Sequence, residues 1–287
     1  MGVVSILDSH LLSKRMPGLR AFLLPVAIIH LAFGSLLFVL FPLSEDIDIW
    51  PVLVAAISGI IRTGAVIIML YSLKKEEVSR VIPVVYSYPI LVAIMAMPLL
   101  GESLTRLEWL AIVIVVIGAV MVSVKRSPSG SAKLPAKLLF LLFGSSLLFA
   151  AADITSKYAL AYISFWNMFW ISAFCMSGIF LLLSLRPRIL NQLINMKKKS
   201  SAMGILAIDE ALALAGILLS FWALEGGPVS LVSTIISSRP MFVLIFAFII
   251  SRLAPMFLKW DSGNGILAIR LVATAMIVGG ITIIHLL

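Results

Sequence analysis

Six ionisable side chains lie inside long apolar stretches of this sequence. Moving one charge to the centre of a bilayer costs about 2.5–3.5 kcal/mol on insertion scales, so such residues usually face an interior cavity and pair with one another. Because the set contains three bases and three acids, its members could neutralise each other. They predict a polar site inside an apolar bundle, built from Arg62, Lys157, Arg239, Asp153, Asp209 and Glu210.

Asp209 and Glu210 are adjacent, so on a helix their side chains point about 100° apart and cannot share one partner. We expect one to pair with an arginine and the other to face a cavity, where its carboxyl could carry a coupling proton. Two hydrated carboxylates near a helix end are the alternative. Asp153 and Lys157 are four residues apart, acid first, an order that favours an ion pair along one helix. A Lys157 that extends to the membrane surface is the alternative there.

Two tyrosines and a serine near these charges, Tyr86, Tyr88 and Ser237, are further candidates for binding. Guanidinium groups pair with carboxylates in a two-pronged geometry, so Arg62 or Arg239 could hold an anionic group of a bound molecule. Core packing is the alternative for both tyrosines. Together with the adjacent acids, these residues predict a cavity that can hold a small polar molecule.

Metal and cofactor chemistry has no support in this sequence. The single cysteine, Cys175, lies in an apolar run and can form neither a disulfide nor a multi-thiolate metal site. The three histidines, His10, His30 and His285, show no ligand spacing, and His30 has no evident acid partner. We therefore expect no metal and no cofactor.

The stretch at residues 71–100 is repeated 151 positions later, at residues 222–250, with serines, valines and one proline in register. The matched prolines are Pro89 and Pro240, each within a long apolar run. Proline inside a helix removes a backbone donor and frees the carbonyl group four residues earlier. In lipid such a break is tolerated only where protein or a watery cavity satisfies the freed group. Matched breaks in two halves point to a transport site; simple packing kinks are the alternative.

The composition indicates a membrane protein. Hydrophobic residues make up 62% of the chain and charged residues 12%, about half the roughly 25% of soluble domains. A span needs about 20 apolar residues, and we expect nine: Ala21–Phe41, Val52–Leu73, Val81–Leu100, Trp109–Val124, Leu138–Ala161, Phe165–Leu185, Ala202–Ala223, Val229–Ile250 and Ala268–Leu287.

A tenth, partial helix precedes these spans. A shift of 143 positions sets Ser13 and Lys14 over Ser156 and Lys157, so residues 1–16 match the second half of a helix. We interpret this as a late start codon or a truncated chain, with a native half-helix as the alternative. The chain then contains two halves of five helices, residues 1–124 and 138–287, joined by a basic linker at 125–137. Because five is odd, the halves enter the membrane from opposite sides, which predicts an inverted repeat.

Basic residues are distributed unequally between the loops. We number the loops in chain order, beginning with the loop that follows the partial first helix. The odd-numbered loops carry eighteen Lys and Arg residues, whereas the even-numbered loops carry only Arg106, beside six acids. Because Lys and Arg favour the cytoplasmic side, we expect the odd loops in the cytoplasm and Leu287 outside. The net charge of +9 is then a topology signal and a contact for anionic lipids, so no nucleic-acid partner is expected. Residues 186–199 predict a short interfacial helix.

The segment at residues 222–252 resembles the closing repeat of EamA-type members of the drug/metabolite transporter superfamily. Residues 81–124, with Gly101 and Glu102 before a glycine-bearing helix, resemble the first repeat. The resemblance implies a ten-helix bundle of two inverted five-helix repeats, a central cavity and alternating access for small metabolites or drugs. Two departures are the short first helix and Arg252-Leu253 in place of Gly-Glu. The family is commonly described with both ends in the cytoplasm, whereas the charges here favour the opposite.

We therefore predict an all-α integral membrane transporter of the plasma membrane, not an enzyme, whose partners are a small-molecule solute and lipids. A homodimer is an open alternative. A lipid-carrier flippase of the same fold is the nearest alternative function. An intramembrane enzyme acting on a lipid is the alternative from another class, although Asp209-Glu210 is the only adjacent acid pair within a span.

Overall fold

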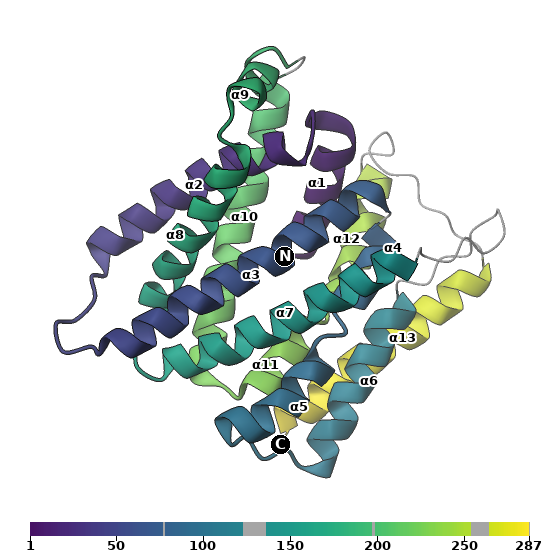
Figure 1. The fold of residues 1–287 in the computed structure, drawn as a ribbon. Helices are drawn as coiled ribbons and strands as arrows, with labels where there is room; N and C mark the ends of the chain where they lie inside the picture. The colour runs from purple at the N-terminus through teal and green to yellow at the C-terminus, as the bar shows by residue number, and fades with distance from the viewer. Residues whose placement is uncertain (77, 123–135, 197–198, 254–263, 287) are drawn as a thin grey trace.

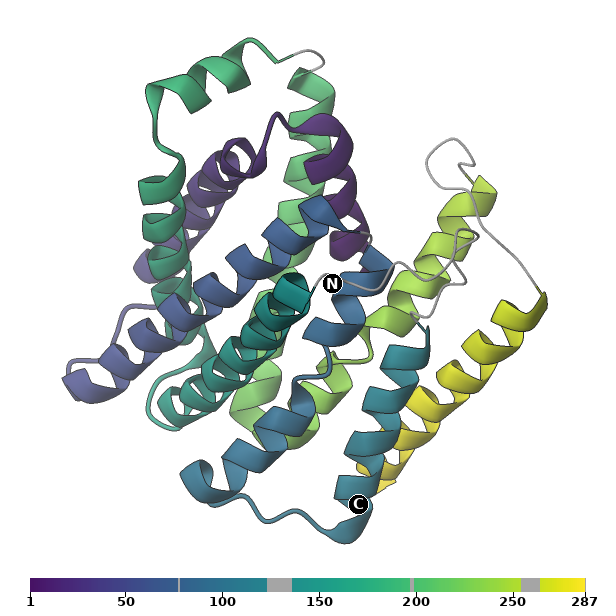
Figure 2. The same ribbon diagram turned by 45° about the vertical axis from the view of Figure 1, so that its right-hand side comes forward.

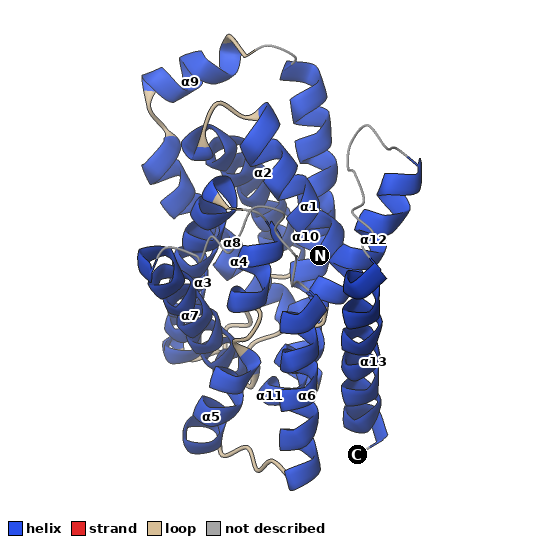
Figure 3. Cartoon of the chain, turned by 90° about the vertical axis from the view of Figure 1, so that its right-hand side faces the viewer, coloured by secondary structure: helices blue, strands red, loops and turns tan. Residues whose placement is uncertain are grey.

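The chain is all-helical in a computed structural model that describes residues 1–76, 78–122, 136–196, 199–253 and 264–286. Within these ranges there are helices and no strand (Figure 3). Almost all of the predicted linker at 125–137 lies outside the described residues. The elements are α1 Gly2–His10, the π-helix η1 Leu11–Arg15, α2 Leu19–Leu40, α3 Ile49–Lys75, α4 Val78–Val85, α5 Pro89–Leu100, α6 Arg106–Val122, α7 Ala136–Leu160, α8 Phe165–Ser184, α9 Pro187–Ile194, α10 Lys199–Gly226, α11 Val229–Ile236, α12 Arg239–Leu253 and α13 Asn264–Leu286.

Five of the described helices, α2, α3, α7, α8 and α10, are long and apolar enough to cross a membrane. Each exposes large apolar side chains, such as Leu36, Phe140 and Leu182, as expected of a surface that faces lipid. These helices confirm the prediction of a multi-pass membrane protein. The runs predicted as single spans at residues 81–100 and 229–250 differ, because each is divided into two helices, α4 and α5, and α11 and α12.

Both divisions occur at the repeated prolines. Pro89 is the first residue of α5, and Pro240 is the second residue of α12. Ser87 Oγ donates to Val84 O at 2.8 Å, and Ser238 Oγ makes the corresponding bond to Ile235 O at 2.7 Å. Both the donors and the acceptors are 151 positions apart. At each break, a serine hydroxyl therefore donates a hydrogen bond to a backbone carbonyl group of the preceding helix.

A second hydroxyl reaches the first break from another helix. Ser146 of α7 donates to Val84 O at 2.8 Å and to Val85 O at 3.3 Å. The latter is the carbonyl group that Pro89 leaves without its helical donor. A side chain of α7 therefore stabilises the break between α4 and α5. This contact also connects the break to the second half of the chain.

Helices from the two halves pack against each other throughout the bundle (Figures 1 and 2). The largest contacts join α3 to α7, α6 to α13 and α2 to α8, while α1 packs on α12 and α10. The paired helices α2 and α8 run antiparallel, as do α6 and α13. The loops at residues 41–48, 101–105 and 161–164 lie at one end of the bundle, and α9 lies at the other. The predicted helix at residues 186–199 corresponds to α9.

Glu102 links the end of α5 to the start of α11. Gly101 ends α5 in the left-handed conformation, with φ of 69°, which glycine adopts without steric cost. Glu102 then accepts hydrogen bonds from Val229 N at 2.5 Å and from Ser230 Oγ at 2.6 Å. A carboxylate at a helix N-terminus satisfies free N–H groups and complements the helix dipole. The Gly-Glu pair thus joins the first half of the chain to a helix of the second.

Candidate functional site

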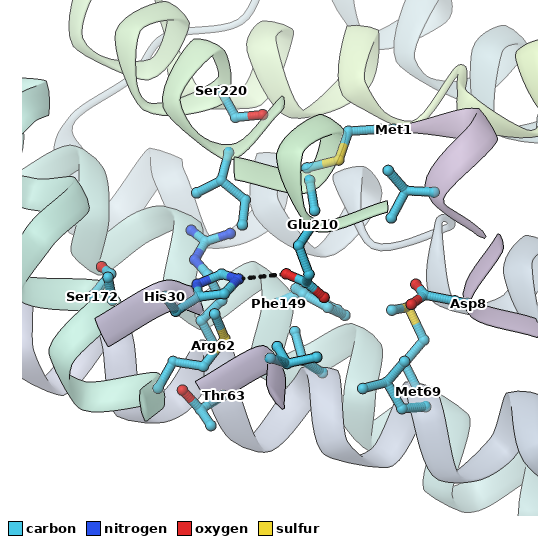
Figure 4. Close-up of a pocket in the computed structure, with 18 of the residues that line it drawn as sticks. Met1, Asp8, His30, Arg62, Thr63, Met69, Phe149, Ser172, Glu210 and Ser220 are labelled. Carbon is cyan, nitrogen blue, oxygen red and sulfur yellow. Dashed lines mark hydrogen bonds and ion pairs between the residues drawn. The ribbon is translucent and has the colours of Figure 1, made fainter. Parts of the chain in front are cut away.

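A cavity of about 150 Å³ lies between helices of both halves of the chain. Its walls are mainly apolar, with Phe22, Phe149, Phe169, Phe180 and Phe221 among the lining residues. Polar groups enter from several helices: Asp8 from α1, His30 from α2, Arg62 and Thr63 from α3, Tyr86 after α4, Ser172 from α8, Glu210 and Ser220 from α10, and Arg239 from α12. Figure 4 labels all of these except Tyr86 and Arg239. Apolar walls with a few convergent polar groups are typical of small-molecule sites.

Glu210 is held by a histidine. His30 Nε2 lies 2.9 Å from Glu210 Oε2, and the two side chains are only 4% and 6% exposed (Figure 4). The expectation that His30 lacks an acid partner is wrong, because the fold brings α2 beside the middle of α10, 180 residues further along the chain. An ionised carboxylate buried in an apolar wall requires such a partner.

Arg62 belongs to a network that crosses the two halves. Its Nη2 donates to Asp153 Oδ1 at 2.9 Å and to Ser156 Oγ at 3.2 Å, while Ser233 Oγ donates to Asp153 Oδ2 at 2.7 Å. The guanidinium carbon also lies 5.1 Å from the centre of the Phe221 ring. Arg62 Nε is buried and has no hydrogen-bond partner among the described residues. The paired arginine also lines the cavity.

The ion pair expected between Asp153 and Lys157 is not formed. Asp153 pairs with Arg62 instead, because its side chain is directed at α3 and α11. Lys157 Nζ donates to the carbonyl oxygens of Leu224 at 2.8 Å and Glu225 at 3.2 Å, at the end of α10. These carbonyl groups have no helical donor of their own, so the lysine serves as a C-terminal cap.

Arg239 contacts Tyr86, so the two helix breaks touch each other. Its Nη1 donates to the Tyr86 hydroxyl, and its guanidinium carbon lies 4.9 Å from the centre of that ring. Within the described part of the chain, no carboxylate lies within ion-pair distance of Arg239. The cavity is therefore lined by a guanidinium group that has no carboxylate partner among the described residues, close to both prolines.

The structure brings together four of the seven predicted binding and coupling residues and leaves three outside the cavity. Arg62, Tyr86, Glu210 and Arg239 line it. Tyr88 is buried against Tyr86 and Phe149, with ring centres 6.3 Å and 6.0 Å away. Ser237 bonds within its own chain segment, to Thr234 O at 2.7 Å. Asp209 is fully buried, and its acidic neighbours are Asp8 and Glu210.

Sequence reasoning missed two residues of this site, Asp8 and His30. Both are buried and both line the cavity. Asp8 lies within the half-helix that the sequence predicts, and His30 lies in the middle of an apolar span. An ionisable residue inside an apolar helix is a candidate for function. This criterion could have identified both residues from the sequence. Among the described residues, no group of three or more His, Cys, Asp or Glu side chains could hold a metal ion.

Comparison with known proteins supports a transporter. Residues 2–124 match the model of the EamA-like transporter family. No curated protein matches the sequence. Among solved structures, one crystal structure of a protein that is 16% identical superposes with a TM-score of 0.68, over 98% of this chain and 95% of that chain. At this identity the structural match supports the fold alone.

The family match agrees with the apolar helices. EamA-like proteins are transporters, and five helices in the described part of the chain can cross a membrane. A multi-pass transporter of the drug/metabolite type is thus supported, in a lipid environment and with a small-molecule solute. The resemblance seen in the sequence is confirmed: residues 2–124 match the model of the EamA-like transporter family, which belongs to the drug/metabolite transporter superfamily.

Proposed function

We propose that this protein is a secondary transporter that moves a small solute with an anionic group by alternating access, and that a proton on Glu210 is coupled to the movement. The observation that carries the proposal is Arg239, a guanidinium group in the cavity with no carboxylate partner among the described residues. An intramembrane charge of this kind is a candidate contact for a charged substrate. The match to a transporter family favours this reading over an intramembrane enzyme.

The moving parts in this proposal are two inverted five-helix repeats, residues 1–124 and 138–287. Three observations support them. The helix pairs α2 and α8, and α6 and α13, run antiparallel. The serine bonds at the two breaks recur 151 positions apart. Contacts also recur, since α5 packs on α7 as α12 packs on α1. Such repeats place the solute between two bodies that can rock against each other.

The solute would lie among the aromatic walls with its anionic group on Arg239, near Arg62, which also lines the cavity. A guanidinium group binds a carboxylate through two parallel hydrogen bonds. Tyr86 already fixes the Arg239 side chain, so less conformational freedom is lost on binding. Tyr88 and Ser237, which were also candidates for binding, would support the wall from behind.

A transport screen tests this function. Proteoliposomes are supplied with a mixture of small metabolites, and uptake and export are measured by mass spectrometry for the wild type, Arg239→Gln and Arg106→Gln. We expect at least one carboxylate-bearing solute to be moved by the wild type and by Arg106→Gln, because Arg106 is exposed at the start of α6. Transport should fall about 10–100-fold in Arg239→Gln, which loses a charged hydrogen bond of about 1.5–3 kcal/mol. Equal transport of neutral and anionic solutes by all three proteins would refute the role of Arg239.

The orientation proposed from the charges places α9 in the cytoplasm and Glu45 outside, in the plasma membrane. Cysteines introduced singly at Asn191 and Ser44, in a Cys175→Ser background, report this on intact cells with an impermeant thiol reagent. Both positions are exposed. We expect labelling at position 44 and none at 191 until the cells are opened. The reverse pattern would invert the orientation.

A further inference from the structure

One difference between the two halves of the chain lies at a matched position of α3 and α10. The 151-residue shift sets Gly59 of α3 over Glu210 of α10. Gly59 packs directly on α8, where an added Cβ would lie 3.0 Å from Ser172 Cα and 3.1 Å from Cys175 Cβ. The helices α3 and α8 accordingly share an extensive contact, whereas α10 and α2 share a small one.

The smaller contact is the place where Glu210 reaches His30. Across this gap the helices meet through two polar side chains, 2.9 Å apart, in place of a close backbone approach. Both side chains line the cavity, so water or a solute can reach them. If the helices closed over a charged pair that faces a cavity, water would be removed and a net charge would remain in an apolar medium, which is costly. The charged pair therefore opposes closure of the two helices.

We infer that His30 and Glu210 form one proton-binding site, and that proton binding there allows α2 to close on α10. The inference rests on the proposed transport function and adds a second residue to its coupling site. With neutral His30 donating to ionised Glu210, the pair has a charge of −1. One added proton gives either imidazolium with carboxylate or imidazole with carboxylic acid, and the pair then has no net charge. A neutral pair is far less costly to enclose.

Several other helices bring charged groups close to the pair. Asp8 of α1 and Asp209 of α10 interact electrostatically with Glu210. Arg62 of α3, Arg239 of α12 and the amino group of Met1 bring positive charge to the same cavity. The helix α8 contributes the uncharged Ser172, and Asp153 of α7 is occupied by Arg62.

A distance measurement without any solute tests this inference. Spin labels are placed at Arg20 and Ser201, which are exposed at the starts of α2 and α10, in a Cys175→Ser background in lipid nanodiscs. Pulsed electron paramagnetic resonance then gives the distance distribution between about pH 5 and pH 8, the range in which histidine usually titrates. We expect a shift to shorter distances as the pH falls. Glu210→Gln and His30→Asn should each lose the shift, because glutamine is always neutral and asparagine donates a hydrogen bond without titrating.

Matched controls separate the pair from other acids and histidines. Glu45→Gln and His285→Asn change exposed residues of the same types, and both should keep the shift. If His30→Asn does not fold, His30→Gln replaces it. A wild-type distribution that does not change with pH, or a shift that persists in either variant of the pair, would overturn the inference. Because no solute is present, a failed transport screen leaves this result intact, and the reverse also holds.

Discussion

Glu210→Gln is expected to abolish the accumulation of solute that a pH gradient drives. One pH unit supplies about 1.4 kcal/mol per proton, which corresponds to about a tenfold solute gradient for a one-proton coupling. Glutamine keeps the shape and can still bond His30, but it carries no exchangeable proton. In proteoliposomes loaded with the solute that the transport screen identifies, we expect downhill exchange to continue while uphill accumulation falls to the level of protein-free vesicles.

Asp209→Asn is the informative comparison, because Asp209 is adjacent in sequence but does not line the cavity. We expect this variant to keep both accumulation and its pH dependence, as Glu45→Gln should. Folding is checked by size-exclusion chromatography before transport is measured. If a well-folded Glu210→Gln variant accumulates solute like the wild type, Glu210 does not carry the coupling proton. If Asp209→Asn alone loses accumulation, the proton belongs to Asp209.

Breaking the Arg62–Asp153 pair is expected to have the largest effect on stability. Asp153 is 2% exposed and bonds Arg62 at 2.9 Å and Ser233 at 2.7 Å. Removing one partner of a buried pair leaves the other charge uncompensated, which costs about 3–5 kcal/mol. Arg62→Gln and Asp153→Asn should each lower the free energy of unfolding by this amount, measured by denaturation in mixed micelles.

The double variant Arg62→Gln/Asp153→Asn distinguishes an ion pair from two independent contacts. With both charges removed, no unpaired charge remains, so the loss should be clearly smaller than the sum of the two single losses. Arg106→Gln, at an exposed position, should leave the stability unchanged. Strictly additive losses would show that Arg62 and Asp153 contribute separately.

Much of the architecture could be predicted because the membrane imposes strong constraints on a sequence. Apolar runs locate the helices, since every backbone group must be bonded within a span. The repeated prolines predicted the positions of both breaks, because proline cannot continue the hydrogen-bond ladder wherever it lies in the fold. Charged residues within spans pointed to Arg62, Glu210 and Arg239, and all three line the cavity, because desolvation drives such residues towards an interior.

The pairing of these charges was decided by tertiary structure. Sequence spacing favoured Lys157 for Asp153, but the partner is Arg62, 91 residues away. Likewise His30 and Glu210 meet across 180 residues. A helix fixes only which neighbours share its own face, so a local pair competes with every partner that packing brings near.

The sequence by itself determined that the chain spans a membrane, where its helices break and which side chains must avoid lipid. Only the tertiary structure decided which of two adjacent acids faces the cavity. Asp209 and Glu210 point about 100° apart on one helix, and the packing of α2 against α10 turns Glu210 to His30 and leaves Asp209 outside. Helix rotation is set by contacts with neighbouring helices, and those contacts are distributed over the whole chain.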